Sequence, residues 1–159
     1  MQSVLAVEAA PSIENNPEFI KLLIQETELQ EARGCFFIYL SREAAGFAKE
    51  LLAIGELFEE IHPLVSLLSG IKGPAFYDFG LDAESGGVYL FTQSLSAFSI
   101  SSEDAVTKQM ALFQMEEHLV FTADEDNQFL FFTEKHNEEL IRKIANAYQI
   151  EADFLVLDK

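Results

Sequence analysis

The chain has 159 residues, of which 49% are hydrophobic, and it carries 27 Asp and Glu against 10 Lys and Arg, a formal net charge of −17 at pH 7. This surplus of carboxylates disfavours direct binding to nucleic-acid phosphates and to anionic membrane surfaces. The 15 Phe residues indicate a folded core, because disordered acidic segments are poor in aromatic residues.

A single cysteine, Cys35, excludes an internal disulfide framework and is typical of a protein from a reducing compartment. The opening residues, MQSVLAVEAAPS, lack the basic region that precedes the apolar stretch of a secretory signal. No run approaches the roughly 18 consecutive apolar residues of a membrane-spanning helix. We therefore expect a cytoplasmic protein.

The first helix is predicted to begin at Asn16, a favourable N-cap, with Pro17 at its first position. It is expected to continue to Arg33 and to end at Gly34, because glycine is common just after a helix. The next run, residues 35–40, is apolar and aromatic and predicts a strand.

A longer second helix is predicted to begin at Ser41, which can serve as an N-cap. Its apolar residues repeat in steps of four and three, as one face of a helix requires. They are Phe47, Leu51, Ile54, Phe58 and Ile61. Pro63 disfavours further helix, so this helix is expected to end at His62.

Short strands are predicted for residues 75–79, 88–93 and 97–100, which are rich in Phe, Tyr and Val. Gly86 and Gly87 precede the second of these strands and are typical of a hairpin turn.

The segment 101–104, Ser-Ser-Glu-Asp, predicts the start of another helix. On that helix Val106, Met110 and Phe113 share one face. These three residues are the apolar stripe of this helix.

A second strand pair is predicted at residues 118–123 and 129–133, joined by an acidic turn at 124–128. Asn137 is expected to cap a final helix, and residues 154–157 to form a last strand.

Helices and strands come in blocks, which favours an α+β fold with a mostly antiparallel sheet of about five strands packed with about three or four helices. Residues 1–14 are expected to form a loosely held arm, and residues 15–159 a single domain. The strand-to-helix passages at Ser41 and Asn137 are too different in sequence to indicate a repeat.

The acid-rich turn at Asp124, Glu125 and Asp126, with Glu116 and Glu117 before the preceding strand, is the strongest local cluster of charge. A hairpin tip is exposed, so these carboxylates can attract a basic partner. The alternative interpretation is a solubilising hairpin tip that keeps Phe-rich strands from aggregating.

A second acidic group consists of Asp78, Asp82 and Glu84, in a stretch without Lys or Arg. Neither group has the ligand spacing, central Gly and distal Glu of a calcium loop. No metal and no cofactor are therefore predicted.

Two further residue pairs have the spacing or the residue types of a metal or catalytic site, but each lacks other groups that such a site requires. Glu59 and His62 have the three-residue spacing of di-iron helical bundles, but no second such pair exists in the chain. Cys35 with His118 or His136 could form a thiol and base, but an apolar run in an acidic protein favours a structural cysteine. No catalytic motif is recognised, and we expect a protein that is not an enzyme.

In its character, a small acidic α+β chain without catalytic groups, the protein resembles the immunity proteins that neutralise nuclease toxins. The resemblance covers composition and no stretch of sequence. It implies an inhibitor that occludes the basic cleft of a toxin-like partner, with the two acidic groups at the interface. The runner-up is an acidic secretion or folding chaperone that holds a client segment. The number of copies in the assembly is left open.

Overall fold

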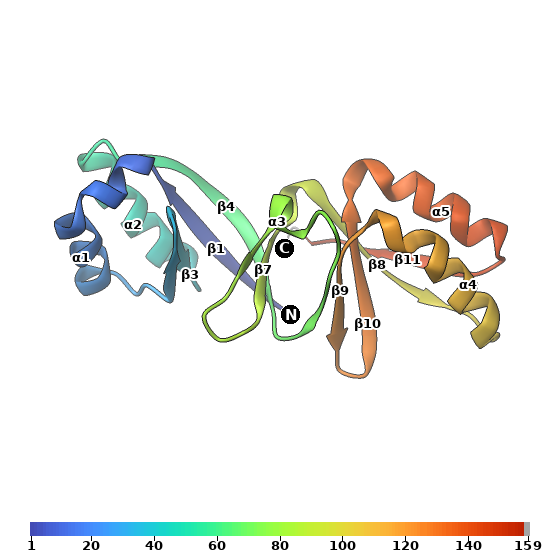
Figure 1. Cartoon of the computed structure of the whole chain (residues 1–159). Helices are drawn as coiled ribbons and strands as arrows, with labels where there is room; N and C mark the ends of the chain where they lie inside the picture. The colour runs from blue at the N-terminus through green and yellow to red at the C-terminus, as the bar shows by residue number, and fades with distance from the viewer. Residues whose placement is uncertain (158–159) are drawn as a thin grey trace.

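The computed structural model describes residues 1–157 and arranges them in two antiparallel sheets with five helices (Figure 1). The first sheet has the strand order β2 (Glu31–Arg33), β3 (Phe36–Tyr39), β1 (Gln2–Ala9), β4 (Phe58–Leu67), β7 (Val88–Phe91), β6 (Gly80–Asp82). The second has the order β11 (Glu151–Leu155), β8 (Leu95–Ser101), β10 (Gln128–Glu134), β9 (Leu119–Glu125), β5 (Gly70–Lys72). The mixed and antiparallel character is as predicted, but residues 1–157 form eleven strands in two sheets and five helices, more than the predicted single sheet of about five strands with three or four helices.

The helices are α1 (Pro17–Glu26), α2 (Arg42–Ile54), the short α3 (Phe76–Phe79), α4 (Ala105–Met115) and α5 (Glu138–Ala147). Chain order and strand order together define two βαββαβ units, an arrangement known as ferredoxin-like. The strands order as β2-β3-β1-β4 in the first unit and as β9-β10-β8-β11 in the second. None of the helices within residues 1–157 is both long enough and apolar enough to cross a membrane.

The two units share local geometry as well as topology. In each, the chain turns from the last helix into the last strand through one residue with positive φ, Glu56 at 57° and Gln149 at 55°. The next residue, Leu57 or Ile150, is buried, and its N–H donates to a carbonyl five residues earlier, at 2.8 and 3.0 Å. This is the Schellman ending of a helix. The passages at Ser41 and Asn137 are thus equivalent in topology, although the sequence indicated no repeat.

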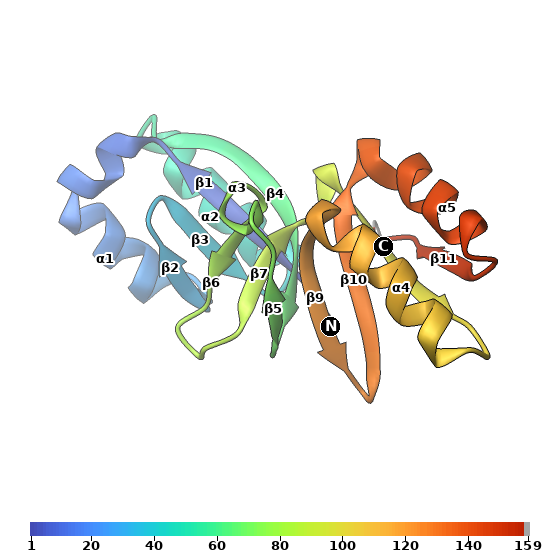
Figure 2. The same ribbon diagram turned by 45° about the vertical axis from the view of Figure 1, so that its right-hand side comes forward.

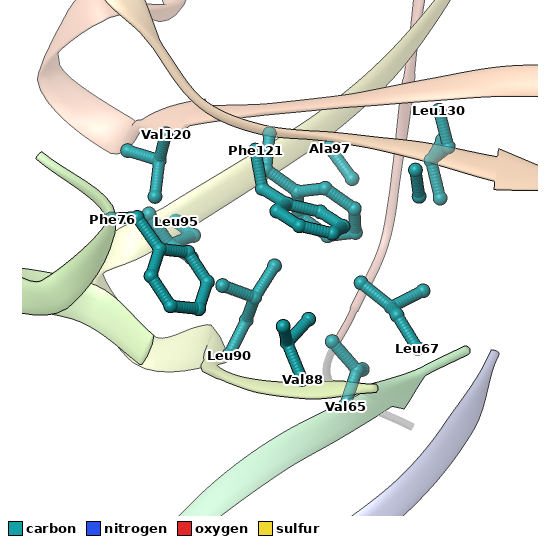
Figure 3. Close-up of a cluster of buried hydrophobic side chains, with 12 residues drawn as sticks. Val65, Leu67, Phe76, Val88, Leu90, Leu95, Ala97, Val120, Phe121 and Leu130 are labelled. Carbon is teal, nitrogen blue, oxygen red and sulfur yellow. The ribbon is translucent and has the colours of Figure 1, made fainter. Parts of the chain in front are cut away.

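A shared apolar core joins the two sheets (Figure 3). From the first sheet, β4 and β7 contribute Val65, Leu67, Val88 and Leu90, and from the second sheet β8, β9 and β10 contribute Leu95, Ala97, Val120, Phe121, Ala123, Leu130 and Phe132. Phe76 of α3 packs at one side of this core. The second sheet therefore buries one face against the first sheet and the other against α4 and α5.

The expected loosely held arm is instead an inner strand. β1 pairs along its length with β4 and over Leu5–Glu8 with β3, and its residues Val4, Ala6 and Val7 are buried. A strand that is buried on both faces has a continuous apolar run without alternation. The short apolar run near the N-terminus has this character.

The second helix is shorter than predicted. α2 ends at Ile54, where Gly55 and the positive φ of Glu56 stop the helix, and residues 58–67 continue as β4. Phe58 and Ile61 matched the helical period by coincidence. A turn glycine and the long-range pairing with β1 override that local pattern.

Pro63 lies within β4, where a proline is unusual. Its carbonyl accepts a hydrogen bond from the Thr92 hydroxyl at 3.3 Å, so its backbone polar groups face the side of β7. β7 pairs with β4 only from Leu64 onward. The missing N–H of Pro63 therefore removes no bond from the ladder.

Two other predicted elements change type. α1 ends at Glu26, and residues 31–33 form β2, which Gly34, with φ 61°, joins to β3 in a hairpin. The segment 75–79, expected as a strand, contains the helical turn α3. The predicted caps at Asn16 and Ser41 are confirmed, because their side chains accept backbone N–H groups three residues on, at 3.2 and 3.1 Å.

β5 begins with Gly70 and is followed by Gly73, because the backbone at both positions lies very close to that of β9. A Cβ atom on Gly70 would lie 2.3 Å from the carbonyl oxygen of Thr122, and one on Gly73 would lie 1.9 Å from that of Leu119. Both positions adjoin β9, with which β5 pairs. The absence of a side chain thus allows the segment that leaves the first sheet to join the second.

We predict that Gly73→Ala lowers the free energy of unfolding by about 2 kcal/mol or more, because the new methyl group clashes with a backbone carbonyl that cannot move freely. Gly46→Ala is the matched control. Gly46 lies within α2, and a methyl group added there would meet no neighbouring atom within 4 Å. That change is expected to stabilise by about 0.5–1 kcal/mol. Urea unfolding of both variants measures the difference, and equal stabilities would contradict the placement of β5.

Candidate functional site

The structure separates the strongest predicted acidic cluster into two parts. Glu116 and Glu117 lie in a 3-10 turn before β9, and residues 124–126 lie at its far end and in the following hairpin turn. β9 has 7 residues, which at about 3.3 Å per residue corresponds to about 20 Å. The two parts therefore do not form one contiguous site.

The hairpin turn is shorter than the predicted segment 124–128, because β9 continues to Glu125 and β10 begins at Gln128. Asp126 and Asn127 have positive φ angles of 47° and 66°, as the two central residues of a type I′ turn require. Asp124 and Asp126 are exposed. The Glu125 carboxylate lies 2.7 Å from the amino group of Met1. Two carboxylates of this turn thus face solvent, and the third takes part in an ion pair.

Within the second acidic group, Asp82 is held by two donors. The ammonium of Lys72 lies 2.5 Å from one carboxylate oxygen, and the Tyr77 hydroxyl donates to the other at 3.0 Å. The hydrogen bond from Lys72, followed by that from Tyr77, holds the pKa of Asp82 below its ordinary value of 3.8. The same contacts raise the pKa of Lys72. Asp82 therefore positions Lys72 beside β6.

The other members of this group lie apart from that ion pair. Asp78 is exposed on α3, at the start of β6, and Glu84 lies in the turn that follows β6. The backbone N–H of Glu84 donates to the Glu31 carboxylate at 3.0 Å, and the Tyr89 hydroxyl donates to the same carboxylate. Burial, together with this hydrogen bond, raises the pKa of Tyr89. The three carboxylates of this group are thus spread along β6: Asp78 lies before the strand, Asp82 is its last residue and Glu84 comes after it.

A groove of about 910 Å³ lies where β5 and β9 meet the helices α4 and α5. Its apolar lining includes Ile71 of β5, Phe113 of α4, and Leu140 and Ile144 of α5. β5 is an edge strand of the second sheet (Figure 2). Ile71 is 71% exposed, because α4 and α5 cover the inner strands of this sheet and leave its edge open.

The apolar stripe of α4 is turned to solvent beside this groove. Val106, Met110 and Phe113 are 67%, 54% and 76% exposed, whereas the opposite side of the helix buries Ala111 and Met115 against the sheet. The periodicity correctly predicted that the three residues share a face. When a helix has apolar residues on both sides, its packing decides which side is buried. Here the side that carries the small Ala111 lies against α5 and the sheet.

The polar rim of the groove is acidic. Glu116 and Glu117 are exposed there, and the His118 ring lies 3.3 Å from Glu117. Lys72 also lines the groove, but its charge is neutralised by Asp82. The groove lining thus contains two carboxylates and one ammonium, and the ammonium is paired with Asp82, which lies outside the lining. An apolar floor with a negative rim suits a segment that combines apolar side chains with Lys or Arg.

Cys35 and the histidines that could activate it belong to different βαββαβ units. Cys35 joins β2 to β3 in the first unit, whereas His118 and His136 belong to the second unit. Burial and then the nearby carboxylates of Glu14 and Glu8 raise the pKa of the Cys35 thiol. A raised pKa lowers the thiolate fraction at neutral pH and so disfavours nucleophilic chemistry.

No known protein-family model matches this chain, and no curated protein matches it in sequence. Sequence reasoning identified Glu116 and Glu117 but missed Ile71 and Leu140 as apolar residues of the same groove lining. The isolated Ile71 between two glycines had no periodicity that could have placed it.

We predict that Lys72→Met raises the pKa of Asp82 towards 3.8, because the principal hydrogen bond that lowers this pKa is lost. In the native protein the paired carboxylate stabilises the fold above pH 3.8, and this contribution is lost as the pH falls through the lowered pKa. Carboxyl carbon NMR titration measures the value. Lys143→Met, a change of equal charge on α5, serves as control, and an equal shift in both variants would contradict the pairing.

Proposed function

We propose that this protein is an acidic protein-binding module that neutralises a basic partner, as an immunity protein neutralises a toxin such as a nuclease. The observation that carries the proposal is the combination of a net charge of −17 with an exposed apolar stripe, Val106, Met110 and Phe113, beside the acidic rim of a groove. An exposed apolar patch with a polar rim is characteristic of a protein-binding surface.

In this proposal the charge and the groove act in succession. The overall negative field raises the rate of encounter with a basic surface. Glu116 and Glu117 then orient the partner, and its apolar side chains are buried against Phe113 and Leu140. The burial of apolar area slows dissociation, and most differences in affinity between related complexes arise from dissociation. The exposed acids Asp124 and Asp126 contribute at longer range.

The second candidate function is a chaperone that holds a client segment in the same groove. The edge strand β5 favours it, because an extended client can pair with an open edge. A chaperone of this kind depends on apolar contacts and binds well in high salt. The inhibitor forms a one-to-one complex whose association slows steeply with ionic strength.

The partner is best sought by capture from the native cell, with the bound protein identified by mass spectrometry. We expect a basic protein whose enzymatic activity is abolished when this chain is added in equimolar amount. Recovery of unrelated apolar segments, bound equally well in high salt, would instead support the chaperone.

With that partner purified, we predict that Phe113→Ser weakens binding by about 30-fold, corresponding to about 2 kcal/mol for an aromatic residue at the centre of an interface. The main effect is expected on the dissociation rate. Ile54→Ser is the control, because Ile54 is also apolar and exposed but lies at the end of α2. Surface plasmon resonance measures both rates. Equal affinities for the two variants would place the interface outside the groove.

A set of charge reversals separates the local acids from the overall field. Glu116→Lys with Glu117→Lys alters the groove rim, Asp124→Lys with Asp126→Lys alters the hairpin turn, and Glu43→Lys with Glu50→Lys alters α2 as a control. Each double variant changes the net charge equally. We predict that the groove pair slows association by about tenfold at low salt and that the control pair has a much smaller effect. Three equal reductions would mean that only net charge matters.

A further inference from the structure

Three possible metal ligands lie together on the face of the first sheet opposite α1 and α2. Glu8 of β1 pairs directly with Glu60 of β4, and Ala6 pairs with His62. Side chains two residues apart in a strand share a face. Glu8, Glu60 and His62 therefore point to the same side, and one potential ligand atom from each lies within 4.8 Å of the other two.

The spacing of these atoms is close to what a zinc ion requires, and in the structure the His62 Nε2 and Glu8 Oε1 atoms form a hydrogen bond. The His62 Nε2 atom lies 2.8 Å from Glu8 Oε1 and 3.8 Å from Glu60 Oε2. Bonds of about 2.1 Å in tetrahedral geometry separate neighbouring ligand atoms by about 3.4 Å, between these two values. Zinc binding would replace the hydrogen bond between His62 and Glu8, move those two atoms apart and draw the Glu60 oxygen closer to His62.

Aromatic neighbours restrict the imidazole. The ring of His62 makes edge contacts with Phe36 and Phe91, at centroid distances of 5.8 and 5.4 Å. Both aromatic rings lie on the same sheet face and limit the rotation of His62. A ligand that is already oriented loses less conformational entropy when the metal binds.

The cluster is open on one side and negatively charged. Glu60 is 61% exposed, whereas the His62 side chain is 18% exposed. A solvent-facing side leaves room for a water as fourth ligand, as in zinc sites with three protein ligands. With a neutral imidazole the two carboxylates give a charge of about −2, which favours a dication.

We propose that Glu8, Glu60 and His62 form a binding site for a zinc ion. Calcium and magnesium prefer sites made only of oxygen ligands, whereas imidazole with carboxylates suits zinc. The sequence indicated a different pair, Glu59 with His62, on the assumption of a helix. In the strand β4, side chains two residues apart share a face, so Glu60 and not Glu59 lies beside His62.

The test is calorimetric titration with zinc chloride in a Cys35→Ser background, which removes the thiol as a competing ligand. We expect one zinc ion per chain, and at least about tenfold weaker binding for both Glu60→Gln and His62→Gln. Glu60 is mostly exposed, so its substitution does not threaten the fold.

The matched controls are Glu59→Gln, the adjacent carboxylate, and His136→Gln, an exposed histidine beside Glu134. Both are expected to bind zinc as the parent protein does. Zinc should also raise the thermal midpoint of the parent and of both controls but not of His62→Gln. The proposal is overturned if zinc does not bind, or if the controls weaken binding as much as the ligand variants do, which is the behaviour of adventitious surface binding.

Discussion

The packing of one sheet against the other is the constraint on which the rest of the structure depends. Val65 and Leu90 from the first sheet meet Phe121 and Phe132 from the second in one shared core (Figure 3). Neither βαββαβ unit covers this part of its sheet with its own helices. The apolar area buried between the sheets must therefore hold the two units together against the repulsion expected of a net charge of −17.

This packing also determines which surfaces remain for binding. Because one face of the second sheet lies on the first, α4 and α5 must both fit on the other face, where α4 buries Ala111 and Met115. The apolar stripe on the other side of this helix, which includes Phe113, is left outside. On the first sheet, the face opposite α1 and α2 carries a separate buried apolar cluster, and on the same face Glu8 and His62 remain partly exposed. The groove and the three-ligand cluster are thus on separate parts of the molecule.

The duplicated topology shows how different residues satisfy the same geometric requirement. The hairpin of the first unit turns at Gly34, and that of the second turns at Asp126 and Asn127, all with positive φ. The last helix of each unit ends with a left-handed residue, Glu56 or Gln149. A turn requires a conformation rather than a particular residue. The repeat is therefore visible in the fold and invisible in the sequence.

The sequence by itself determined what depends on near neighbours: the caps at Asn16 and Ser41, the hairpin at residues 118–133, and the surplus of carboxylates on a chain able to fold. Only the tertiary structure decided that residues 58–67 are a strand, that the stripe with Phe113 faces solvent, and that Glu60 rather than Glu59 lies beside His62. Caps and turns are made within a few residues and leave a local pattern. Strand partners and buried helix faces depend on segments far along the chain, and no short-range periodicity records them.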